Sequence, residues 1–160
     1  MLLFIYGTGW SINDFHGLWG INEIPRYVAV PLTVFACVGI INAINMIDGV
    51  DGLMSGYSIV VSIILAAFFF KAADMDLSAM AMIAAGALIP FFMFNVVGQK
   101  SKMYLGDGGS LMIGTMLALF VVSILKHKSL CSMSVDDSFG LVPFTLAILS
   151  VPVFDTLRVM

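Results

Sequence analysis

The chain is 160 residues long, and its amino acids are 61% apolar and only 11% charged, whereas a soluble domain carries about 25% charged residues. This composition excludes an ordinary water-soluble domain and favours a protein whose solvent is lipid. The net charge is −3, and the seven lysines and arginines are scattered without forming a basic stripe, which argues against a nucleic-acid partner.

Five apolar segments approach the roughly 20 residues that a transmembrane helix needs. They cover residues 27–47, 53–70, 77–97, 110–125 and 139–157. We therefore predict an all-α fold, a polytopic bundle of transmembrane helices that forms a single membrane domain. The six apolar residues at the start are too few to cross a membrane. We expect them to be the end of an earlier helix, and the chain to be part of a larger bundle.

Polar connectors separate these segments, and each crossing reverses the direction of the chain. Connectors 48–52 and 98–109 must then share one face of the membrane with the C-terminal residues 155–160. We call this face the acidic end. The polar side chains that the alternation brings there are Asp48, Asp51, Asp107, Asp155, Asn42, Asn45 and Asn95. Basic residues are divided almost evenly between the two faces, so their distribution does not decide which face is cytoplasmic.

The first polar motif is NAINMIDGVDG at residues 42–52, where a predicted helix leaves the membrane. Asn42, Asn45 and Asp48 recur every three residues and therefore project from one side of a helix. A polar group at membrane depth is costly unless it is paired or hydrated. We expect these side chains to line a water-filled cleft. The alternative is that Asp48 and Asp51 only cap the next helix.

The second motif is YLGDGGS at residues 104–110. Gly106, Gly108 and Gly109 allow backbone amides to approach a ligand, and the N-terminus of the following helix favours phosphate. Asp107 would repel a phosphate by itself, but with a divalent cation it would complete a diphosphate site. A plain helix cap is the alternative for this turn. Tyr104 fits either a stacking role or the aromatic belt of the membrane interface.

Three ordered motifs, NAINMIDGVDGL, MYLGDGGSLMIG and VPVFDTLRVM, resemble those of the polyprenyl-phosphate N-acetylhexosamine-1-phosphate transferases, glycosyltransferase family 4. The ending PVFDTLRV resembles the branch that transfers N-acetylglucosamine (GlcNAc) phosphate to undecaprenyl phosphate. The segment INDFHGLWGINEIP resembles members from Bacteroidetes. The resemblance covers the middle and later part of the family's usual length, so we expect residues 1–160 alone to be inactive.

The motifs and the resemblance together give nine candidate site residues, and the resemblance itself implies roles for six of them. Asp107, with Asp48, would bind magnesium, or manganese as the alternative ion, and Tyr104 would stack on uracil. Asn45, Asp48 and Asp51 would belong to the nucleotide pocket, and Asn95 to the cleft. The expected catalytic residues are Asp48, Asp51 and Asp107, and the expected substrate-binding residues are Asn42, Asn45, Asn95, Tyr104, Gly106 and Gly108.

The implied reaction transfers a sugar 1-phosphate, expected to be GlcNAc-1-phosphate, from a UDP-sugar to undecaprenyl phosphate and releases UMP. It would begin the synthesis of a cell-envelope polysaccharide such as cell-wall polymer or lipopolysaccharide. The expected location is the bacterial inner membrane, with the active site on the cytoplasmic face and a homodimer as an admissible assembly. One alternative is the phospho-MurNAc-pentapeptide translocase reaction of peptidoglycan synthesis. Another, of a different class, is a transporter that uses intramembrane carboxylates.

Overall fold

The computed structural model describes Ile5, Gly7, Gly9, Ser11, Ile12 and residues 24–48, 52–96, 105–126 and 141–159. The helices are α2 (Arg26–Ile47), α3 (Leu53–Lys71), α4 (Met75–Val96), α5 (Gly106–Lys126) and α6 (Leu141–Val159). The described residues contain no strand. The prediction of an all-α fold is therefore confirmed.

Four of these helices, α2 to α5, are long and apolar enough to cross a membrane. The apolar part of α6 is shorter and covers Val142–Thr156. Large apolar side chains point outward, among them Phe35 at 78%, Phe154 at 71% and Ile83 at 70% exposure. Such an outer surface would aggregate in water and is the surface that lipid requires.

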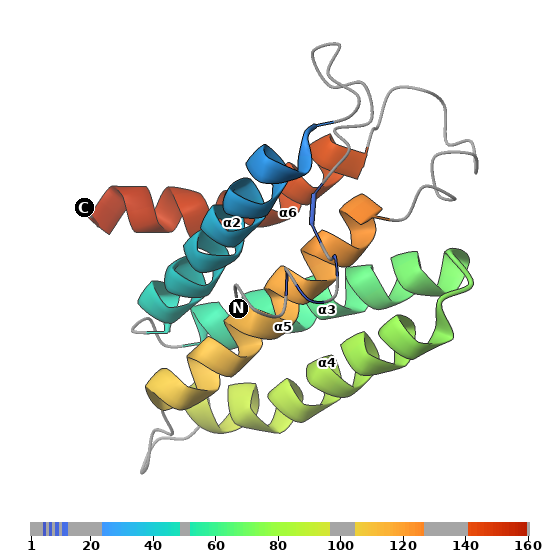
Figure 1. The fold of residues 1–160 in the computed structure, drawn as a ribbon. Coiled ribbons are helices and arrows are strands. Elements are labelled where there is room, and N and C mark those ends of the chain that lie inside the picture. Colours follow the sequence, from blue (N-terminus) through green and yellow to red (C-terminus); the bar gives the residue numbers. More distant parts are fainter. Residues whose placement is uncertain are drawn as a thin grey trace.

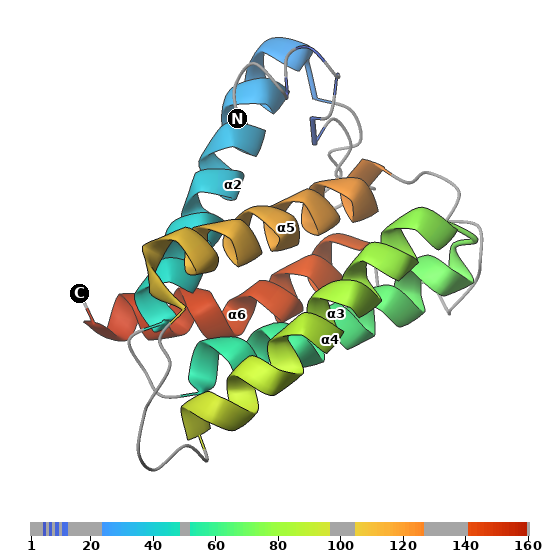
Figure 2. The same ribbon diagram turned by 90° about the horizontal axis from the view of Figure 1, so that it is seen from below.

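The five helices pack mainly as two antiparallel pairs (Figures 1 and 2). α3 lies along α4, and α2 lies against α5. α6 packs chiefly against α2. Aromatic contacts join the pairs, since the Phe69 ring of α3 lies 5.8 Å from that of Phe120 in α5, and Phe68 stacks on Phe144 of α6 at 5.2 Å.

The turn between α3 and α4 is short and well defined. Ala73 has a positive φ of 60°, and the Asp74 carboxylate accepts a 3.2 Å hydrogen bond from the Leu77 backbone N–H, as an N-cap residue does. One turn further on, the Ser78 hydroxyl donates to the Ala66 carbonyl at 2.9 Å. The two helices are therefore fastened to each other at the end remote from the acidic end.

Chain direction alternates as predicted. The C-terminal ends of α2, α4 and α6 and the N-terminal ends of α3 and α5 all lie on the left side of Figure 1. Gly52 holds two of these ends together. It has a φ of 75°, and a side chain at this position would strike Val96 and Phe92 of α4. Only glycine fits both the backbone conformation and the close approach.

Most helix boundaries lie within two residues of the prediction, but the start of α5 differs by four. The connector expected at 98–109 ends earlier, because α5 begins at Gly106. The Gly-Asp-Gly segment is therefore the first turn of α5 and not a loop in front of it. Within this turn the Ser110 hydroxyl lies 3.2 Å from the carbonyls of both Gly106 and Asp107 and donates its hydrogen to them.

Candidate functional site at the acidic end

The last turns of α2 bring three polar groups to the acidic end. Asn42 is exposed, Asn45 is half-buried, and Asp48 follows the helix as its C-cap. The Asp48 backbone N–H donates to the Asn45 carbonyl at 3.3 Å, so the chain keeps a helical course to the carboxylate. The predicted spacing is thus preserved, and the three side chains lie on neighbouring turns.

The first turn of α5 faces these residues. The Asn45 side-chain amide donates a 2.7 Å hydrogen bond to the hydroxyl of Ser110, which is fully buried. Asp107 and Gly108 in the same turn are exposed. Gly106 has a φ of 69°, and there is open space around both Gly106 and Gly108. Because the first N–H groups of a helix have no intrahelical partners, this turn still offers donors to an anion.

Asp48 and Asp107 are electrostatic neighbours. Burial raises the pKa of the Asp48 carboxyl above its ordinary value, and the negative charge of Asp107 raises this pKa further. Asp48 is half-buried and Asp107 is exposed, and a divalent cation would stabilise two carboxylates that repel each other in this way.

The donor set fits one class of metal site. No group of three or more His, Cys, Asp or Glu side chains within the described ranges could hold an ion. Two carboxylates, with phosphate oxygens of a substrate completing the shell, are typical of magnesium, whereas zinc prefers nitrogen and sulfur ligands. Asp48 and Asp107 therefore fit magnesium that binds together with its substrate.

Asn95 lies in the last turn of α4 and is 95% buried, with 5% of its surface exposed. Its Oδ1 atom accepts no hydrogen bond from any residue that the structure describes. Buried polar atoms nearly always have partners, and an unpartnered one requires an explanation. This acceptor is covered by the protein, and a ligand that displaced the covering groups could supply its N–H or O–H partner.

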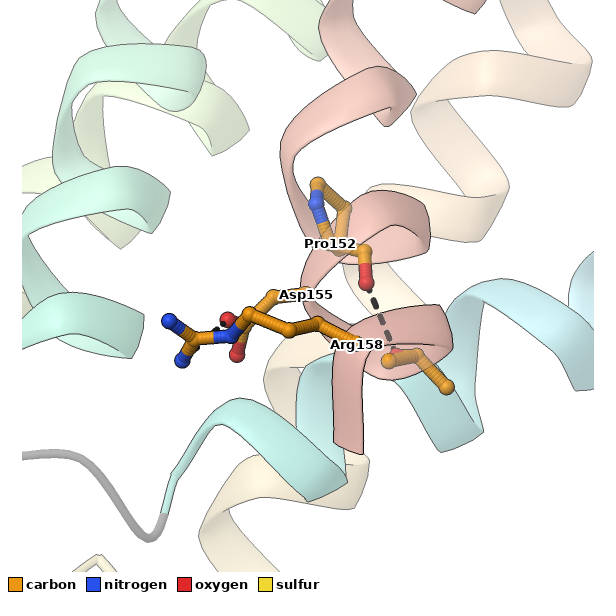
Figure 3. A network of polar contacts seen from close by, with 4 residues as sticks. Pro152, Asp155 and Arg158 are labelled. Carbon is orange, nitrogen blue, oxygen red and sulfur yellow. Dashed lines mark hydrogen bonds and ion pairs between the residues drawn. The ribbon is translucent and has the colours of Figure 1, made fainter. Parts of the chain in front are cut away.

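Asp155 is neutralised within its own helix. Its carboxylate forms a 3.0 Å ion pair with Arg158, whose side chain is 76% exposed (Figure 3). Beside it, the Thr156 hydroxyl donates to the Pro152 carbonyl at 2.8 Å. Asp155 therefore reaches the acidic end as the alternation predicted, but its charge is already paired.

The described residues include seven of the nine predicted site positions. Asn42, Asn45, Asp48, Asn95, Asp107, Gly106 and Gly108 are all at the acidic end. Asp51 and Tyr104 lie outside the described residues, and their roles stay predictions. The contact that the sequence reasoning missed is Ser110. Its signal was present as small residues at every fourth position, Gly106, Ser110, Gly114 and Ala118, a pattern typical of closely packed membrane helices.

The chain is similar in sequence to known sugar-phosphate transferases. The family model described as glycosyl transferase family 4 matches residues 1–125. A Bacillus subtilis protein named probable undecaprenyl-phosphate N-acetylglucosaminyl 1-phosphate transferase is 33% identical over 81% of this chain and 34% of its own length. A phospho-N-acetylmuramoyl-pentapeptide-transferase of Enterococcus faecalis is 32% identical over 78% of this chain and 38% of its own.

A third relative is the decaprenyl-phosphate N-acetylglucosaminephosphotransferase of Mycobacterium leprae, which is 29% identical over 98% of this chain and 42% of its own length. The chain thus spans between 34% and 42% of the length of these curated relatives. No solved structure matches it.

Proposed function

Since the chain belongs to glycosyl transferase family 4, we propose that its protein transfers GlcNAc-1-phosphate from UDP-GlcNAc to undecaprenyl phosphate. An oxygen of the lipid phosphate attacks the phosphorus that carries the sugar. A new P–O bond forms, the P–O bond to UMP breaks, and UMP leaves with the electron pair. The GlcNAc relatives from B. subtilis and M. leprae support this donor.

The observation that carries the proposal is that Asp48 at the end of α2 and Asp107 in the first turn of α5 lie at the same end of the bundle, where the Asn45–Ser110 hydrogen bond joins the two helices. Magnesium bound there would neutralise the developing charge on the diphosphate, which is the main contribution that phosphoryl transfer needs. Asp48 and Asp107 would hold the ion. The free N–H groups in the first turn of α5 would bind phosphate oxygens.

The other polar groups would position the nucleotide and sugar. The buried, unpartnered Asn95 Oδ1 would accept a hydrogen bond from a substrate that displaces the groups covering it, and Asn42 and Asn45 would contribute amide groups from α2. Asp51 completes the proposed acidic set, and Tyr104 is proposed to stack on uracil. Holding reactants in the correct geometry can supply a large part of a rate enhancement, about 7–11 kcal/mol in favourable cases.

The protein is a multi-pass membrane protein, as its apolar helices and its relatives indicate. We propose the bacterial inner membrane as its location, with the acidic end on the cytoplasmic side, where nucleotide sugars are made. We also propose that the protein forms a homodimer and acts in the synthesis of cell-wall polymer or lipopolysaccharide. The transporter alternative receives no support from these matches, since the relatives named above are all transferases.

The E. faecalis relative favours a second candidate donor, UDP-MurNAc-pentapeptide. The test is a comparison of donors in membranes that contain the complete protein, with undecaprenyl phosphate and magnesium. We expect UMP and a lipid-linked sugar product from UDP-GlcNAc. Turnover with UDP-MurNAc-pentapeptide alone would establish the second candidate. Turnover with neither donor would refute both.

A further inference from the structure

The contact between α2 and α5 is unusually close at two adjacent turns. Asn45 bonds Ser110, and one turn away Ile41 meets Gly114. A Cβ atom on Gly114 would lie 3.0 Å from the Ile41 Cα and 3.3 Å from the Ile41 carbonyl oxygen. The absence of a side chain at Gly114 therefore permits the backbone separation at which a short Asn45–Ser110 bond forms.

The donors and acceptors of the Ser110 hydroxyl determine the direction of the Asn45–Ser110 hydrogen bond. A serine hydroxyl has one hydrogen and two acceptor lone pairs. The Ser110 hydroxyl lies 3.2 Å from the carbonyls of both Gly106 and Asp107, and it gives its hydrogen to them. It must therefore accept from Asn45, which supplies Nδ2 at 2.7 Å. The Asn45 amide is locked with its N–H toward Ser110, and Oδ1 is the atom left for other partners.

The same hydroxyl also bonds the backbone of Asp107. Ser110 thus hydrogen-bonds both the Asn45 side chain and the peptide unit that carries the Asp107 carboxylate. Its complete burial keeps water from replacing either bond. The hydroxyl therefore fixes the position of Asp107 relative to α2. It also determines which atom of the Asn45 amide remains available to a ligand.

We propose that Ser110 is a positioning residue, which orders the Asp107 turn and the Asn45 amide so that the acidic end presents an oxygen-only cradle to a divalent cation. The inference rests on the proposed function for its activity readout. A hard cation prefers oxygen ligands, and an amide turned with its N–H outward would repel it. Residues that orient metal ligands matter greatly, since removing such a partner typically costs about 10- to 100-fold in metal affinity.

The variant that tests this is Ser110→Ala, and its matched control is Ser123→Ala. Ser123 is also a buried serine of α5, and its hydroxyl also donates to the carbonyl four residues earlier, Leu119, at 2.8 Å. Ser123 lies toward the opposite end of the helix, so its loss reports only the structural cost of removing such a bond.

Two readouts are needed, and one does not depend on turnover. The first is the magnesium concentration that gives half-maximal UMP release by the complete protein. The second is the binding of Mn²⁺ to the purified protein in nanodiscs, followed by the EPR signal of free Mn²⁺. We expect Ser110→Ala to raise both half-saturation values about 10- to 100-fold, and Ser123→Ala to leave them unchanged.

Double substitution separates positioning from general damage. Asn45→Ala together with Ser110→Ala should be no worse for Mn²⁺ binding than the more severe single variant, because both remove the same interaction. Effects that multiply, an unchanged Mn²⁺ affinity in Ser110→Ala, or an equal loss in Ser123→Ala would each overturn the inference. If Ser110→Ala does not accumulate in membranes, Ser110→Cys preserves the side-chain volume with a weak donor, and the same rise is expected.

The two proposals fail in different ways. If the unaltered protein releases no UMP from any donor, the proposed function is wrong, and Mn²⁺ binding still decides the role of Ser110. If UMP release is normal but Ser110→Ala binds Mn²⁺ as tightly as the unaltered protein, only the inference about Ser110 is wrong.

Discussion

The Tyr57 hydroxyl of α3 donates a 2.6 Å hydrogen bond to the backbone carbonyl of Ile148 in α6. In an α-helix this carbonyl would accept from the N–H of residue 152, four positions later. Residue 152 is a buried proline and has no N–H. Tyr57 therefore supplies the donor that Pro152 removes, across 91 residues of sequence.

We expect Tyr57→Phe to destabilise the protein by about 1–3 kcal/mol, the cost of leaving a buried carbonyl without a donor. Thermal unfolding in detergent measures this change. In a Pro152→Ala background the helix regains its own N–H, and the loss should nearly disappear. Tyr27→Phe is the control, because Tyr27 is 78% exposed. An equal loss from Tyr57→Phe with and without Pro152 would show that the proline is irrelevant.

Asp107→Asn should abolish magnesium-dependent UMP release by the complete protein, because an amide cannot neutralise the cation as a carboxylate does. The control is Asp76→Asn, an exposed acid in the first turn of α4 at the other end of the bundle, which should keep full activity. Near-normal turnover of Asp107→Asn at saturating magnesium would remove Asp107 from the metal role.

Asn95→Leu should make the protein more stable and less able to bind UDP-sugar. Replacing a buried amide whose oxygen lacks a donor removes a desolvation cost of about 1–3 kcal/mol. The unfolding midpoint and the dissociation constant for UDP-GlcNAc are the measurements. Asn42→Leu, at an exposed position of α2, should give no gain in stability. A less stable Asn95→Leu variant would mean that the oxygen is satisfied within the protein.

Gly114→Ala should weaken the α2–α5 contact, because the new methyl group would press on backbone atoms of Ile41 that cannot move aside. Overpacking of this kind costs about 1–3 kcal/mol. We expect a lower unfolding midpoint together with reduced UMP release. Gly39→Ala is the matched control, since it adds the same group to α2 where nothing lies within 4 Å. Equal behaviour of the two variants would argue against close approach as the function of Gly114.

For Tyr104 the prediction comes from sequence alone. Phe should be tolerated, and Ala should weaken UDP-sugar binding by about 1–3 kcal/mol, the scale of base stacking on an aromatic ring. Isothermal titration with UDP-GlcNAc distinguishes the variants. If Tyr104→Ala binds as well as the unaltered protein, Tyr104 is a residue of the aromatic belt.

Apolar length and the alternation of direction predicted the helices and the acidic end, because lipid imposes both constraints on any chain. Helix boundaries were harder where glycine occurs. Gly106 to Gly109 suggested a loop from their conformational freedom, yet the segment is helical, and the next residue, Ser110, bonds Asn45 of α2. A contact with α2, which no local sequence pattern contains, outweighs the low helix propensity of glycine here.

The lengths of the connectors also did not predict which helices pack against each other. α3 packs along α4, the helix that follows it, but α2 packs closely on α5 and little on α3, although connector 48–52 between α2 and α3 is also short. The α2–α5 contact contains the close approach at Gly114 and the Asn45–Ser110 hydrogen bond, and neither follows from connector length. The pairing of Asp155 with Arg158, in contrast, follows from a spacing of three residues on a helix and was accessible in the sequence.

The two helix pairs differ in how far apart along the chain their contacts lie. Ser78 reaches Ala66 across 12 residues, whereas Asn45 reaches Ser110 across 65. Loss of chain entropy on closing a loop grows with loop length, so the α3–α4 hairpin is expected to assemble first and the α2–α5 contact later. Completion of the acidic end is then a late event in folding. If folding stopped just before this event, the molecule would already be inserted in the membrane and helical. Asp48 and Asp107 would still be apart.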